Sequence, residues 1–79
     1  MYQKLPPDPE GMNDVRATWA KQALLQFIVN TGTDWADALG DLLANLMHLC
    51  DRDRELDFER SLQTARGHYA EETREDANV

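Results

Sequence analysis

Residues 34–50, DWADALGDLLANLMHLC, form the most periodic stretch of the chain, and this stretch decides the predicted fold. Large apolar residues recur in it at helical spacing: Trp35, Leu39, Leu42, Leu46 and Leu49. At about 100° per residue they form one apolar stripe along a helix. A second stripe at the same spacing is polar: Asp34, Asp37, Asp41, Asn45 and His48. We therefore expect a helix over about 34–51 with one core face and one carboxylate–histidine face.

Two further helices are predicted on either side of this one. Asn13 is a suitable N-cap for a helix over about 14–30, which Gly32 would end, and Thr33 is expected to cap the central helix. Asp57 is a suitable N-cap for a third helix over about 58–73. The prediction is an all-α three-helix bundle (13–73) with an extended, Pro-rich N-terminal arm (1–12) and a polar tail (74–79). The expected core consists of Trp19, Phe27, Trp35, Leu39, Leu42, Leu46, Leu49, Phe58, Leu62 and Tyr69.

Length, charge and cysteine content narrow the class of protein. The chain has 79 residues, enough for one small domain of marginal stability, and a formal net charge of −7. That charge argues against direct binding of nucleic acid or of an anionic membrane, and it permits binding to a basic protein surface. A lone cysteine, Cys50, and the lack of a signal-peptide pattern or a long apolar run favour a cytoplasmic protein.

The first predicted helix is apolar on two sides. Trp19 and Phe27 belong to its core face, and Leu25 and Val29 lie nearly opposite Phe27 and its neighbours. A helix with two apolar sides is either buried between neighbours or used at an interface. In so short a chain we favour an interface and predict self-association, as a homodimer, through Leu25 and Val29.

The polar stripe and the histidines are the candidate sites of chemistry in this sequence. Magnesium could bind to Asp34, Asp37 and Asp41 if a second helix supplied further carboxylates. Asp34 and Asp37 are also typical of a helix N-terminus, where acids stabilise the helix dipole, and Asp41 is typical of a solvated helix face. His48 and Cys50 point in different directions on one helix and match no zinc spacing. No nucleophile or phosphate-loop motif is present. We therefore predict no catalytic residue, metal or cofactor.

One resemblance covers residues 11–73. Its motifs are Met12-Asn13-Asp14, Trp19-Ala20, Thr31-Gly32-Thr33-Asp34, DALGDLL at 37–43, Leu46-Met47-His48, Asp51-Arg52 and His68-Tyr69. This pattern resembles a family of short uncharacterised proteins of bacteria and their mobile elements, including phages. The resemblance implies a helical accessory protein. It also adds weight to inhibitors of host defence, such as anti-CRISPR proteins, since these are often small and acidic.

A second, distant resemblance joins ALGDLL at 38–43 to Leu56 and the following helix. This segment is similar to the second helix pair of MazG-like all-α nucleotide pyrophosphohydrolases, which use magnesium. Asp41 matches the aspartate of their Glu-x-x-Asp pair, but Ala38 stands where the glutamate is expected. The first helix offers Lys21, Gln22 and Gln26 in place of paired glutamates. The resemblance thus implies a related helix hairpin without the catalytic metal set.

The sequence leads to three functional hypotheses. The first is a non-enzymatic protein-binding module, an inhibitor of a host nucleic-acid-handling complex that occludes a basic surface. A magnesium-dependent relative of the pyrophosphohydrolases and a structural accessory subunit are the alternatives. The residues expected to meet the basic partner are Asp34, Asp37, Asp41, His48, Asp51, Asp53 and Glu55.

Overall fold

The computed structural model describes residues 5–74 and contains three helices: α1 (Met12–Thr31), α2 (Trp35–Arg52) and α3 (Phe58–Glu72). No strand occurs within the described residues. The predicted all-α three-helix fold is confirmed, and each helix boundary lies within about two residues of its expected position. Residues 1–4 of the predicted arm and 75–79 of the predicted tail lie outside the described part. None of the three helices combines the length and apolar character needed to cross a membrane.

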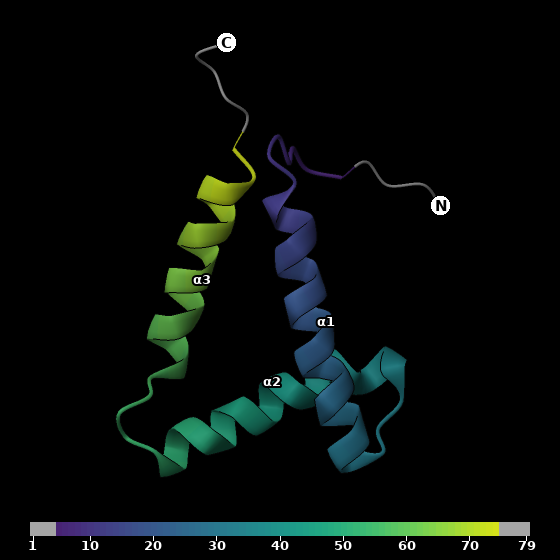
Figure 1. The fold of residues 1–79 in the computed structure, drawn as a ribbon. Helices are drawn as coiled ribbons and strands as arrows, with labels where there is room; N and C mark the ends of the chain where they lie inside the picture. The colour runs from purple at the N-terminus through teal and green to yellow at the C-terminus, as the bar shows by residue number, and fades with distance from the viewer. Residues whose placement is uncertain (1–4, 75–79) are drawn as a thin grey trace.

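The helices form an open triangle (Figure 1). The helix α2 is one side, and α1 and α3 extend from its opposite ends in the same general direction. The start of α1 and the end of α3 approach each other again at the far corner, beside the N-terminal arm. Packing is most extensive between α1 and α2, and it is less extensive between α2 and α3.

The start of α1 differs from the prediction. Asn13 lies inside the helix, and Gly11, in the left-handed region with φ 73°, takes the N-cap position. The carboxylate of Asp8 reaches over the turn and accepts hydrogen bonds from the backbone N–H groups of Asn13 (2.9 Å) and Asp14 (3.1 Å). Asp8 thus satisfies two of the N–H groups that a helix start leaves without partners. The expectation that Asn13 caps this helix is wrong.

The two connections follow the expected chemistry more closely. Gly32 ends α1 with φ 73° and donates its N–H to the carbonyl oxygen of Ile28 (2.7 Å). A residue in the left-handed conformation commonly ends a helix, and glycine adopts this conformation without steric cost. Asp57 caps α3 by accepting a hydrogen bond from the N–H of Arg60 (3.0 Å), as predicted. Asp34, not Thr33, occupies the N-cap position of α2.

The predicted core is only partly covered. The half-buried members are Phe27, Leu42, Leu49, Phe58 and Leu62. The exposed members are Trp19 (58%), Trp35 (56%), Leu39 (61%), Leu46 (37%) and Tyr69 (61%), so the expectation that these five are buried within the chain is wrong. Among the described residues only Ala38 is fully buried. The physical reason is the open triangle, in which no third helix lies against the remaining apolar face of α2 or the middle of α1.

Candidate protein-binding surface

The side chains of α2 fall into three sectors. Ala38, Leu42 and Leu49 lie within about 40° of one another, and these are the buried and half-buried residues that face the other helices. A second sector, about 100° away, is apolar; it includes the half-buried Cys50, and we call its exposed large residues the α2 apolar face. It consists of Trp35, Leu39, Leu43, Leu46 and Met47.

The third sector of α2 is acidic. Asp37, Asp41 and His48 lie within about 40° of one another and about 160° from the centre of the α2 apolar face. With Asp34 at the N-cap and Asp51 in the last turn, these residues form what we call the acidic strip, and all five are exposed. From Asp34 to Asp51 the strip rises roughly 25 Å along the helix. The acidic and apolar faces of α2 therefore point away from each other.

The structure brings the predicted partner-binding residues together in one row with a short extension. Asp53 and Glu55 lie beyond the end of α2, where the Asp53 carboxylate accepts a hydrogen bond from the N–H of Glu55 (3.1 Å). At the other end of the strip, the Thr33 hydroxyl donates to Asp41 (2.6 Å). All seven predicted residues are exposed. Their carboxylates are therefore accessible to a partner.

The acidic strip lies in a part of the chain without cations. Residues 22–51 contain no lysine and no arginine, although they include four aspartates. The two ion pairs found among residues 5–74 are Arg16–Glu72 (3.4 Å) and Arg74–Glu71 (3.6 Å), both distant from α2 in the sequence. Among residues 5–74 no ion pair involves the strip, and the nearest cation in the sequence is Arg52, directly after Asp51 in the last turn of α2.

No metal-binding site is formed by the described residues. Among them, no three or more His, Cys, Asp or Glu side chains are placed to share one ion. A magnesium site of the pyrophosphohydrolase kind would need several carboxylate oxygens at one point, whereas the acidic strip spreads its carboxylates along a helix. Titration calorimetry with magnesium and a nucleotide-hydrolysis assay test that alternative.

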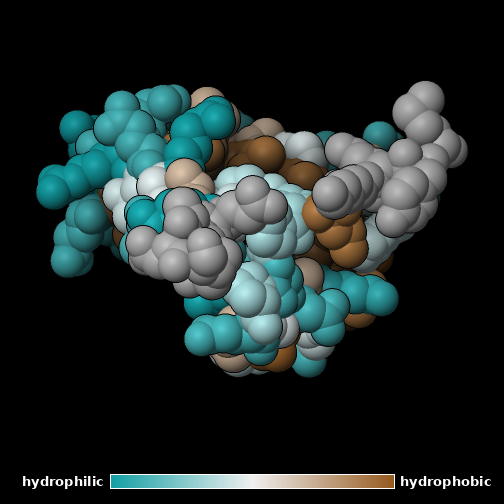
Figure 2. All heavy atoms as spheres, turned by 90° about the horizontal axis from the view of Figure 1, so that it is seen from above, coloured by the Kyte–Doolittle hydropathy of each residue, from teal (hydrophilic) through white to brown (hydrophobic). Residues whose placement is uncertain are grey.

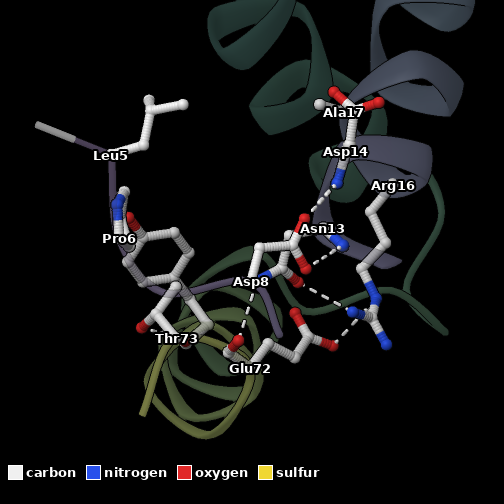
Figure 3. A pocket seen from close by; sticks show the side chains of 10 residues that line it. Leu5, Pro6, Asp8, Asn13, Asp14, Arg16, Ala17, Glu72 and Thr73 are labelled. Atoms are coloured by element: carbon white, nitrogen blue, oxygen red, sulfur yellow. Dashed lines mark hydrogen bonds and ion pairs between the residues drawn. The ribbon is translucent and has the colours of Figure 1, made fainter. Parts of the chain in front are cut away.

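The arm, α1 and α3 meet at a junction that is not among the predicted sites (Figure 3). The Asn13 amide donates to the carbonyl oxygen of Glu72 (2.8 Å) and accepts from Arg16 (2.7 Å), while Arg16 also pairs with the Glu72 carboxylate. A hollow of about 520 Å³ beside these groups is lined partly by Leu5 and Tyr69. The polar network ties the first turn of α1 to the last turn of α3, so we assign it a structural role.

A local signal for part of this junction is present in the sequence. Asp8-Pro9-Glu10-Gly11 has proline and glycine at the positions that a type I turn favours, and the N–H of Gly11 donates to the carbonyl oxygen of Asp8 (3.1 Å). The turn brings the Asp8 side chain back over the start of α1. The contact between Asn13 and Glu72 joins residues 59 apart and has no local signal.

Comparison of the chain with protein-family models, with curated proteins and with solved structures finds no match. The two resemblances drawn from the sequence therefore stay predictions. The surface chemistry of α2 is therefore the main guide to function.

Proposed function

We propose that this protein is a non-enzymatic binding module whose acidic strip docks on a basic protein surface. One observation carries the proposal: the strip is exposed and lies in a 30-residue stretch, 22–51, without lysine or arginine. Such a surface attracts arginine and lysine side chains, including those that hold phosphate in a nucleic-acid-handling complex. Inhibition of such a host complex by occlusion is the form of this function that the sequence favours.

The expected strength of the contact follows from its exposure. Each exposed ion pair contributes about 0.2–1 kcal/mol, so four or five pairs along the strip would contribute roughly 1–5 kcal/mol in total. Such pairs are screened by salt, since the Debye length is about 8 Å at physiological ionic strength. We therefore expect the strip to set partner choice and association rate, with steep salt dependence.

The experiment is affinity capture from an extract of the native host at low salt, with mass spectrometry of the retained proteins. The wild-type chain and the variant Asp37→Lys/Asp41→Lys serve as baits. The matched control is Glu59→Lys/Glu71→Lys, which makes the same change of net charge on exposed positions of α3. Helical content of each bait is checked by circular dichroism.

The proposal expects a specific partner that wild type and the α3 control retain, and that the Asp37/Asp41 variant loses. The same partner should elute with about 0.5 M salt, where the screening length falls to roughly 4 Å. Nucleic acid that binds at the same site of that partner should compete with the wild-type chain. A partner that tolerates both high salt and the Asp37/Asp41 charge reversal would show that the electrostatic account is wrong.

A further inference from the structure

Between 37% and 61% of each residue of the α2 apolar face is left exposed within the described chain. We infer that its occupant is the same face of a second copy, so that two chains complete one fold. This inference concerns the face of α2 opposite the acidic strip and does not depend on the proposed function. It also differs from the sequence-based prediction, which placed self-association at Leu25 and Val29.

The exposed area of the chain is the first argument. The accessible surface is 7184 Å², whereas a folded monomer of 9.0 kDa exposes about 4,900 Å². If roughly 1,500 Å² is set aside for the nine residues outside the described range, the remaining area exceeds the expected value by roughly 800 Å². Stable interfaces bury about 800 Å² per partner, and obligate homodimers bury more. The excess is thus what a dimer interface needs.

The spread of the chain is the second argument. Its radius of gyration is 15.3 Å. A globular chain of 79 residues has a radius of about 12 Å, and a globular body of 158 residues has one of about 15 Å. The chain is therefore more extended than a compact monomer of its length. The open triangle in Figure 1 is the visible form of this spread.

The nature of the exposed surface is the third argument. The α2 apolar face contains Trp35 (56% exposed), Leu39 (61%) and Met47 (50%), besides two further leucines. Hydrophobic residues also reach the surface among hydrophilic ones in the view from above (Figure 2). Soluble monomers rarely expose contiguous apolar patches of this kind unless they are interaction sites. With only Ala38 fully buried in the described region, the chain has too little core to fold stably by itself.

A second copy of the chain is the partner for the α2 apolar face that best explains how the core is completed and how the acidic residues are placed. The core must be completed whenever the protein is folded, and a second copy is the one molecule always present with the first. A net charge of −7 on each chain opposes pairing, but none of the five residues of the α2 apolar face is charged. When two such faces meet about a two-fold axis, the acidic strips lie on the outside and far apart.

The first measurement is the mass of the wild-type chain by sedimentation equilibrium at 1–100 µM. We expect a species of two chains at the upper concentrations. A folded species of one chain throughout this range, or a single species of four chains, would overturn the inference.

The second measurement places the interface with matched variants. Leu39→Glu/Leu43→Glu introduces two carboxylates on the α2 apolar face. Leu25→Glu/Val29→Glu introduces two at exposed apolar residues of α1. Burying ionised groups is strongly unfavourable, so we expect the first pair to raise the dimer dissociation constant at least 100-fold and the second less than threefold. A dimer that the α2 variant leaves intact, or that both variants weaken equally, would contradict the assignment of this face.

Discussion

The carboxylate of Asp8 gives the sharpest test of how the arm and α1 are joined. Asp8→Ala removes the acceptor for the backbone N–H groups of Asn13 and Asp14. Loss of a capping side chain costs about 1 kcal/mol, and loss of a negative charge at a helix N-terminus costs about 0.3–1 kcal/mol more. We therefore expect Asp8→Ala to lower the free energy of unfolding by about 1.5 kcal/mol.

The assay is urea unfolding followed by circular dichroism at one fixed protein concentration. For an m-value of about 1–3 kcal/mol/M, the midpoint should fall by roughly 0.5–1.5 M. Asp8→Asn keeps one acceptor oxygen without the charge and should lose about half as much. Glu10→Ala removes a neighbouring exposed carboxylate and, like most surface changes, should stay within about 0.5 kcal/mol. If Asp8→Ala were indistinguishable from Glu10→Ala, the capping role of Asp8 would be refuted.

Substitutions at four other positions test single features of the fold. Gly32→Ala should lower the free energy of unfolding by about 1 kcal/mol, because φ is +73° at this position. Gly67→Ala should raise it by about 0.5–1 kcal/mol, because Gly67 lies within α3 with open space around the new methyl group. Urea titrations of the two variants test these opposite signs. Asp57→Ala removes the cap of α3 and should cost about 1 kcal/mol, with Asp57→Ser close to wild type in the same assay. Asn13→Ala removes the amide that donates to the Glu72 carbonyl oxygen. Amide hydrogen exchange in the last turn of α3 should therefore become about fivefold faster. Unchanged exchange would show that the junction does not stabilise this turn.

The helices could be predicted from the sequence because their signals are local. The spacing of Trp35, Leu39 and Leu42 sets the length of α2, and Gly32 and Asp57 set two of the boundaries. The acidic strip could also be predicted, since residues three and four apart share one side of a helix. These features depend only on neighbours within a turn or two.

The covering of the apolar faces could not be predicted in the same way. Periodicity shows that Leu39 and Leu42 lie on one broad side of α2, but it does not show where a neighbouring helix stops covering that side. Leu42 is half-buried, whereas Leu39 is 61% exposed. Trp19 likewise has the size and spacing of a core residue, yet it is 58% exposed. The angles between helices, which decide burial, depend on contacts such as Asn13–Glu72 between distant parts of the chain.

The central claim is that one chain lacks part of its core and a second copy supplies it. Its most direct test is the thermal unfolding midpoint, measured by circular dichroism at 1 and 100 µM. For coupled folding and dimerisation, a 100-fold rise in concentration adds about 2.7 kcal/mol to stability. For a folded body of about 160 residues that corresponds to a rise of roughly 5–11 °C. The account predicts this rise, and the same midpoint at both concentrations would contradict it.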